Sequence, residues 1–197
     1  MSADEEGARA EELLAADELA GSGRTQEAEA AYLALLKKSP DNEEVHFNLG
    51  FLYGRTGRTN EAIAQYEAAL KLLPTYAEAH SNLGNLYVRM KRFDDALRHL
   101  EAAIAADPAN SRSQNNLGTA LASAGQVTNA IPYFARAVQL NPDFAEAWFN
   151  LGRSQLVAGR LDEAILALEA AVRLSPNLAP AQAQLQKARQ IRQARGF

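Results

Sequence analysis

Cysteine is absent from this chain of 197 residues. Without thiols the protein can form neither disulfides nor the thiolate metal sites that stabilise many small domains. A protein without disulfides suits a reducing compartment. We therefore expect a cytoplasmic protein.

Signals for secretion and membrane insertion are missing as well. Residues 1–6 (MSADEE) are acidic and polar, whereas a signal peptide begins with basic residues followed by an apolar stretch. No run of apolar residues approaches the ~20 that cross a bilayer as a helix. The sequence predicts a soluble protein that does not enter a membrane.

A strong excess of either charge is also lacking, since the net charge is −4. This balance provides no general attraction to nucleic acid, and the basic residues are not interleaved with aromatic ones on one face. The charge is nevertheless unevenly distributed: residues 1–42 carry a net −6, and residues 179–197 carry four basic side chains and no acid. We expect no nucleic-acid partner, and the oppositely charged ends permit a weak head-to-tail association of copies.

The sequence does contain a repeat of 34 residues. Prolines occur at this step as Pro40, Pro74, Pro108, Pro142 and Pro176. The same step separates Ala28, Ala62, Ala96, Ala130 and Ala164, then Leu49, Leu83, Leu117 and Leu151, and also Gly50, Gly84, Gly118 and Gly152. Self-similarity at a fixed period of this length is typical of solenoid proteins.

Each repeat reads as two helices. In residues 77–110, apolar side chains recur at helical spacing from Ala79 to Tyr87 and again from Ala96 to Ile104. Proline then ends the second helix, because it disfavours helical geometry in the residue before it. Four of the turns inside the repeats contain a glycine, which suits a helix C-terminus, and the turn at residues 90–92 has none. Small residues such as Gly84 and Ala96 are expected where the two helices cross.

The series Trp148-x-x-Leu151-Gly152, followed by Ala164, Leu168, Ala171 and Pro176, resembles the signature of the tetratricopeptide repeat family. The resemblance implies an all-α fold: a right-handed α-solenoid of antiparallel helix pairs. It divides the chain into a disordered N-terminal tail (1–8), five repeats (9–42, 43–76, 77–110, 111–144 and 145–178) and a C-terminal capping helix (179–197). The first repeat departs most, with Ala15-Ala16 in place of Leu-Gly, and Gln186 replaces the glycine of the last helix.

No group of residues predicts catalysis. His46 and His80 occupy the repeat position that Trp148 holds in the fifth repeat, which indicates packing rather than metal binding. Residues 21–25 (GSGRT) lack the Gly-Lys-Ser/Thr ending of a phosphate-binding loop. The carboxylates lie mostly at second-helix starts, where acidic groups interact favourably with the helix dipole. We predict a non-enzymatic protein without cofactor or metal.

A series of asparagines predicts the binding surface. In the family that the chain resembles, first helices line the concave face, and the sixth residue of four repeats is Asn48, Asn82, Asn116 and Asn150. An amide both donates and accepts hydrogen bonds, as a peptide backbone requires. The units resemble those in the repeat arm of O-linked N-acetylglucosamine transferases. The alternative is that asparagine is simply common at this position in the family.

We expect further residues around this series to line the same groove. They are Phe47, Phe51, Asn85, Arg112, Asn115, Phe149 and Arg153. Exposed phenylalanines would form apolar pockets for ligand side chains, or they could pack against a neighbouring helix. The basic pairs with which one subclass grips a C-terminal carboxylate are missing from the corresponding positions.

Three functional hypotheses follow. The first is a module that binds an extended peptide or partner segment in its concave groove. The second is a self-assembling scaffold, suggested by the charged ends. The third is the targeting arm of a larger enzyme, such as a glycosyltransferase, since nothing in these residues would itself catalyse a reaction.

Overall fold

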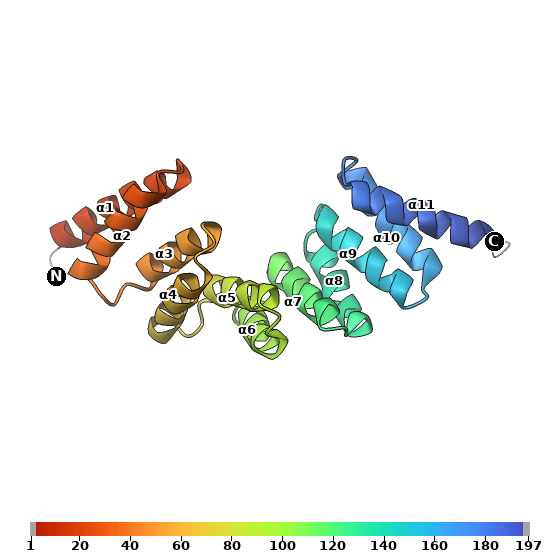
Figure 1. The fold of residues 1–197 in the computed structure, drawn as a ribbon, viewed down its shortest axis with the longest axis horizontal. Helices are drawn as coiled ribbons and strands as arrows, with labels where there is room; N and C mark the ends of the chain where they lie inside the picture. The colour runs from red at the N-terminus through yellow and green to blue at the C-terminus, as the bar shows by residue number, and fades with distance from the viewer. Residues whose placement is uncertain (1–2, 195–197) are drawn as a thin grey trace. The chain divides into compact units, whose positions relative to one another are not determined.

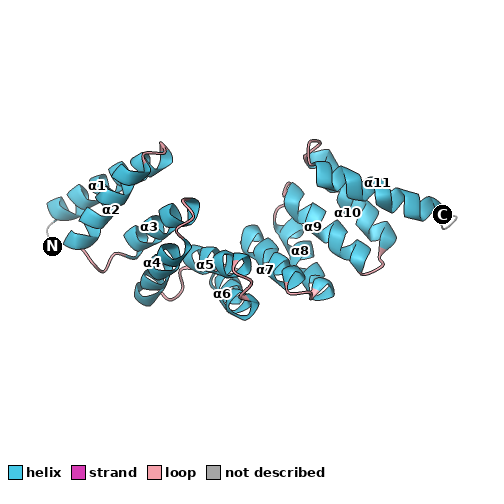
Figure 2. Ribbon diagram, in the orientation of Figure 1, coloured by secondary structure: helices cyan, strands magenta, loops and turns pink. Residues whose placement is uncertain are grey.

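The computed structural model describes residues 3–194 and shows helices connected by short turns (Figures 1 and 2). The helices of this described range are α1 (Ala3–Gly21), α2 (Thr25–Lys38), α3 (Glu43–Arg55), α4 (Thr59–Leu72), α5 (Ala77–Arg89), α6 (Phe93–Ala106), α7 (Ser111–Ser123), α8 (Val127–Leu140), α9 (Ala145–Val157), α10 (Leu161–Leu174) and α11 (Ala179–Ala194). The predicted all-α class is confirmed: over residues 3–194 eleven helices follow one another as antiparallel pairs, with α11 as an odd final helix. Within the described residues, no helix is long and apolar enough to cross a membrane.

The helix starts follow the sequence period. Helices α3, α5, α7, α9 and α11 begin at residues 43, 77, 111, 145 and 179. Helix α1 starts at Ala3, so residues 3–8 of the segment expected to be a disordered tail are helical. Alanine and glutamate there are strong helix formers, which explains the longer helix. Residues 1–2 of that segment lie outside the described range.

The chain forms two compact units, one up to Leu86 and the other from Tyr87 onward. In the first unit α1 packs on α2, α3 packs on α4, and α1 and α2 both contact α3. Its buried core includes Tyr32 of α2 and Tyr66 of α4. A Cβ atom on Gly50 would lie 3.0 Å from Cδ1 of Tyr66, so this glycine lets the paired helices approach closely.

In the second unit the consecutive helices α6 to α11 pack on one another in chain order. Its largest buried cluster surrounds Phe134. A Cβ atom on Gly118 would lie 2.7 Å from Cε1 of this ring, and one on Gly152 would lie 2.7 Å from Cγ of Leu168. The glycines therefore lie at helix crossings, as their period predicts.

The turns within the pairs require a left-handed backbone. Gly23, Gly57, Gly125 and Gly159 have φ between 75° and 83°, a region that glycine enters without a Cβ penalty. In the remaining turn Lys91 takes this role with φ of 59°. The turn over residues 90–92 therefore keeps the same geometry without a glycine.

A recurring hydrogen bond joins each proline to the helix that follows it. The side chain six residues after the proline approaches its carbonyl oxygen: His46 Nε2 at 2.9 Å, His80 Nε2 at 3.0 Å, Gln114 Nε2 at 3.4 Å, Trp148 Nε1 at 2.8 Å and Gln182 Nε2 at 2.6 Å. Because a carbonyl oxygen only accepts, Nε2 of each histidine carries the proton. His46 and His80 therefore have the same structural role as Trp148. The sequence indicated the equivalence but not the bond.

Candidate functional site

The first candidate site is a pocket of about 240 Å³ between α1 and α3 in the first unit. We call it the α1–α3 pocket. It is lined by Asp17, Ala20, Gly21, Tyr32, Asn48, Phe51, Leu52 and Arg55. Two of the predicted binding residues, Asn48 and Phe51, are thus brought together.

The polar wall of this pocket centres on Asp17. Its Oδ1 accepts hydrogen bonds from the Tyr32 hydroxyl at 2.6 Å and from Nδ2 of Asn48 at 2.9 Å. Burial, followed by the contact with Asp17, raises the pKa of Tyr32 above its ordinary value. The phenol is protonated at neutral pH in either case, so it donates this hydrogen bond. Asn48 has a second N–H and a carbonyl oxygen beyond this bond. The wall therefore combines a carboxylate with an amide that can both donate and accept.

The apolar wall is formed by Phe51, whose side chain is 47% exposed. The guanidinium carbon of Arg55 lies 5.9 Å from the centre of the ring, and Nη1 of Arg55 donates to the carbonyl oxygen of Ala20 at 3.5 Å. An exposed aromatic ring beside hydrogen-bonding groups is typical of peptide-binding surfaces. The pocket therefore offers both an apolar contact and backbone-like hydrogen-bonding groups.

Phe47 has a different environment from Phe51. Its ring stacks on Tyr76 with centroids 4.8 Å apart and tilts against Tyr66 at 5.7 Å. It packs among α3, α4 and the turn before α5. This environment matches the packing alternative for Phe47.

Asn82 and Asn85 are half-buried on α5.

The predicted asparagines of the second unit are arranged differently. Asn115 and Asn150 are buried, and Nδ2 of Asn150 donates to Oδ1 of Asn115 at 3.0 Å. This bond joins α7 to α9. Asn116 is half-buried and engaged in a contact of its own, whereas Arg112 is exposed on α7.

A second candidate site, the α9–α11 pocket, has a volume of about 320 Å³. It is lined by Arg153, Leu156, Val157, Gly159, Leu161, Gln184, Lys187 and Ile191. Arg153 lies with its guanidinium carbon 5.7 Å from the centre of the Phe149 ring. Phe149 itself is half-buried and packs against the cluster around Leu168 and Leu185. The sequence predicted Arg153 as a binding residue but not the α11 residues Gln184, Lys187 and Ile191. A signal was present, because α11 starts 34 residues after α9 and so corresponds to the first helix of a repeat.

Comparison with models of protein families identifies the type of repeat. A tetratricopeptide repeat model matches residues 81–143 and 123–179, and a TPR repeat model matches residues 16–57 and 55–91. The chain belongs to the tetratricopeptide repeat family. Such repeats are protein–protein interaction modules that bind protein partners, and this is the class of activity that the fold supports. No curated protein matches the sequence significantly.

Several solved structures share the fold of this chain. MamA is 27% identical with a TM-score of 0.75, covering 83% of this chain and 96% of its own. YrrB, described as a TPR protein with an unusual peptide-binding site, is 21% identical with a TM-score of 0.73, covering 89% of this chain and 90% of its own. PilF of Pseudomonas aeruginosa is 18% identical with a TM-score of 0.87, covering 97% of this chain and 87% of its own. These similarities do not bear on the O-linked N-acetylglucosamine transferase arm in particular, which stays a hypothesis.

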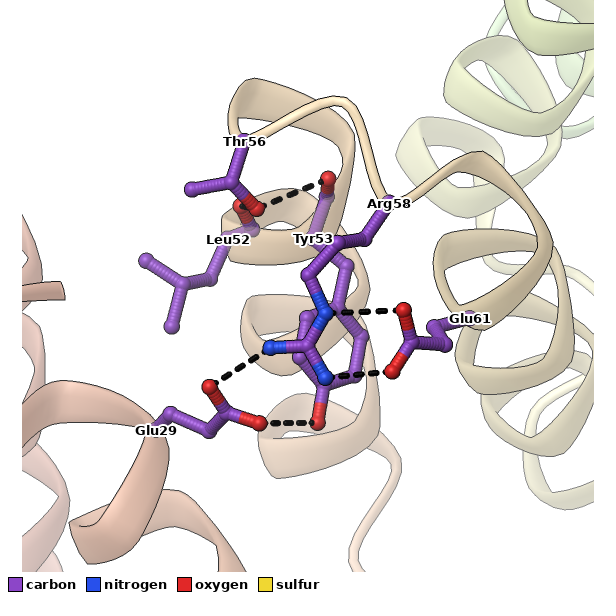
Figure 3. A network of polar contacts seen from close by, with 6 residues as sticks. All are labelled: Glu29, Leu52, Tyr53, Thr56, Arg58 and Glu61. Carbon is purple, nitrogen blue, oxygen red and sulfur yellow. Dashed lines mark hydrogen bonds and ion pairs between the residues drawn. The ribbon is translucent and has the colours of Figure 1, made fainter. Parts of the chain in front are cut away.

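A polar network ties the first two tetratricopeptide repeats together (Figure 3). Arg58, at the start of α4, donates through Nη1 to Glu29 of α2 at 2.6 Å and through Nε to Glu61 at 2.7 Å. Its guanidinium carbon lies 4.1 Å from the centre of the Tyr53 ring, and the Tyr53 hydroxyl donates to Glu29 at 3.0 Å. The hydrogen bond from Arg58 lowers the pKa of Glu29 and of Glu61. Arg58 is shared by both carboxylates and joins α4 to α2.

Proposed function

We propose that this chain binds an extended segment of a partner protein against its first helices. The observation that carries the proposal is the α1–α3 pocket, where the exposed ring of Phe51 lies beside the Asp17–Asn48 pair. The family supports a protein partner. The pocket supports a peptide, because it presents groups that match both a side chain and a backbone.

The expected contacts divide between the two walls. An apolar ligand side chain would cover Phe51, since burying apolar surface favours association. Ligand backbone N–H groups would donate to Asp17, and a ligand carbonyl would accept from Asn48. The preference of this chain among ligand sequences would therefore depend mainly on one apolar ligand residue.

The proposal retains the asparagine series in a narrower form. Asn48 and Asn82 are its members in the first unit, and Asn116 and Asn150 are those in the second. Because Asn150 is buried against Asn115, we give the larger share of ligand binding to the first unit. Arg112, Phe149 and Arg153 would contribute at most secondary contacts.

The wider setting of the module follows from the same proposal. We keep the division into five repeats over residues 9–178, with 179–197 as a cap, and a cytoplasmic location. The chain could equally serve as the targeting arm of a larger enzyme such as a glycosyltransferase, because peptide binding is what such an arm supplies. The proposal assigns no reaction to this chain.

Selection from a library of random peptides tests the proposal. Enriched peptides would be labelled, and their affinities measured by fluorescence anisotropy. Changing Phe51→Ser should weaken binding about 10- to 100-fold, since burial of one aromatic side chain contributes ~1.5–3 kcal/mol. Leu33→Ser is the matched control, because Leu33 on α2 is also 47% exposed. No enrichment, or equal effects of the two changes, would contradict the proposal.

The asparagine series needs a separate measurement. Asn82→Ala should weaken the binding of the same peptides about 2- to 10-fold, as expected for the loss of a neutral hydrogen bond of ~0.5–1.5 kcal/mol. Its melting temperature should stay level or rise slightly, because alanine is the better helix former. A lower melting temperature with unchanged affinity would show that this asparagine is structural.

A further inference from the structure

The α9–α11 pocket has a distinct chemistry that peptide binding in the first unit does not use. Leu156, Val157 and Ile191 give it an apolar lining, and the long cationic side chains of Arg153 and Lys187 line it from two different helices. Val157 is 67% exposed, which is unusual for an apolar side chain that lines a concavity. The pocket suits an apolar group flanked by negative charge.

Helix α11 strengthens this positive character. It carries Lys187, Arg189 and Arg192 and no acidic residue. Arg189 forms an ion pair with Glu169 of α10 at 2.8 Å. Lys187 instead contributes its charge to the pocket.

The complementary pattern occurs on α1. Glu11, Leu14 and Glu18 are all exposed, and Leu14 is 61% exposed. Their spacing of three and four residues places them on one face of the helix. The face therefore presents a leucine between two carboxylates, within a segment of net charge −6 over residues 1–42.

We propose that copies of this chain associate head to tail, with Leu14 of one copy seated in the α9–α11 pocket of the next. Glu11 and Glu18 then face Arg153 and Lys187, so the like-charged ends never meet. The occupant of the pocket is thus a second copy, chosen because an acidic–apolar–acidic stripe matches a pocket lined by apolar and cationic side chains. A single helix on a single pocket buries less area than a stable interface, so the association is weak and reversible. Because the two surfaces differ, the contact can repeat along a chain of copies.

Sedimentation velocity of the full chain gives the first test. The weight-average sedimentation coefficient should rise with protein concentration over about 0.01–1 mM, the range of weak association. Raising NaCl from about 0.05 M to 0.5 M should raise the dissociation constant about tenfold, because exposed charges are screened. A monomer at every concentration and salt level would overturn the proposal.

Mixing two variants tests the direction of the contact. One variant combines Leu14→Ser with Glu11→Gln and Glu18→Gln and disables the α1 face. The other combines Arg153→Gln with Lys187→Gln and disables the α9–α11 pocket. Each variant alone should stay monomeric, whereas a 1:1 mixture should form dimers and nothing larger, since only one working contact is available. Leu166→Ser is the control, because Leu166 on α10 is an exposed leucine like Leu14 but lies outside the pocket. Association of either disabled variant at the level of the unmodified chain would overturn the proposal.

A charge exchange separates pairing from general repulsion. Glu11→Lys with Glu18→Lys should abolish association, and adding Arg153→Glu and Lys187→Glu to the same chain should restore it. Circular dichroism melting of each variant checks that the helices remain folded. Failure of the folded fourfold variant to associate would show that these groups do not pair.

Discussion

The two units of this chain use different contacts between successive repeats. In the first unit, side-chain hydrogen bonds join successive repeats: Asp17 accepts from Asn48, and Glu29 accepts from Arg58 and Tyr53. In the second unit a buried apolar cluster around Phe134 extends over α6 to α10, and Asn150 donates to Asn115 between α9 and α7. One repeat pattern therefore allows different side chains to join successive repeats. The residues that recur every 34 positions determine the helix pair. The residues that differ between repeats determine how each pair packs on its neighbours.

The close packing of α7 on α8 in the second unit should be sensitive to side-chain volume. Gly118→Leu is expected to lower the free energy of unfolding by ~1–3 kcal/mol through overpacking, because even a Cβ atom there lies 2.7 Å from the Phe134 ring. The control is Gly54→Ala in the first unit, where the nearest atom would lie 3.9 Å away. That change should be neutral or stabilise by up to ~1 kcal/mol, because alanine favours a helix over glycine. Urea denaturation of both variants checks the contrast, and equal destabilisation would contradict it.

The hydrogen bonds around Asp17 in the first unit should be sensitive to a lost partner. Asp17→Ala leaves the buried Tyr32 hydroxyl without its acceptor, and we expect a loss of ~1–2 kcal/mol. Adding Tyr32→Phe should recover part of this loss, since the hydroxyl is then gone as well. A double-mutant cycle by urea denaturation measures the coupling. A coupling free energy near zero would show that the hydrogen bond contributes nothing to stability.

The turn at Lys91 should respond to backbone conformation alone. Lys91→Gly is expected to raise the free energy of unfolding by ~0.5–1 kcal/mol, because a left-handed residue with a Cβ atom is strained. Gly125→Lys places lysine at the equivalent turn and should have the opposite sign. The melting temperatures of the two variants test this pair of expectations.

The smallest expected effect is a pH dependence at Glu29 of the first unit. The hydrogen bond from Arg58 lowers the pKa of Glu29, so the folded state favours the ionised carboxylate. The resulting stability is present above the ordinary glutamate pKa of ~4.3 and is lost as pH falls through the lowered value. Exposed ion pairs contribute little, so the loss should be modest. Urea midpoints between pH 3 and 7 should fall less steeply for Glu29→Gln than for the unmodified chain, and identical slopes would contradict the assignment.

Much of the fold could be predicted because its determinants are local. Proline ends a helix through its own ring, glycine permits a left-handed turn, and apolar spacing selects the helix face. The repetition of these signals at 34 residues was enough to predict the helix pairs and their turns. Even the exception at residues 90–92 was visible in the sequence, although the positive φ of Lys91 was not.

The candidate site could be predicted only in part. Helical spacing placed Phe51 on an exposed face, and the structure brings it beside Asn48 in the α1–α3 pocket. The same spacing placed Phe47 in the groove, yet its ring stacks on Tyr76. Likewise, the sequence assigned Asn150 and Asn115 to a ligand, and the structure pairs them with each other.

The sequence by itself determined the helices, their order and their repeat, because these depend on residues a few positions apart. Only the tertiary structure decided which side chains of one repeat meet those of the next. Asp17 and Asn48 are 31 residues apart, and Glu29 and Arg58 are 29 apart. Whether such groups lie within 3 Å depends on how the backbones of separate helices pack, and a small change in packing exchanges one partner for another. The surface available for binding is therefore a property of the packed repeats and not of the repeat pattern.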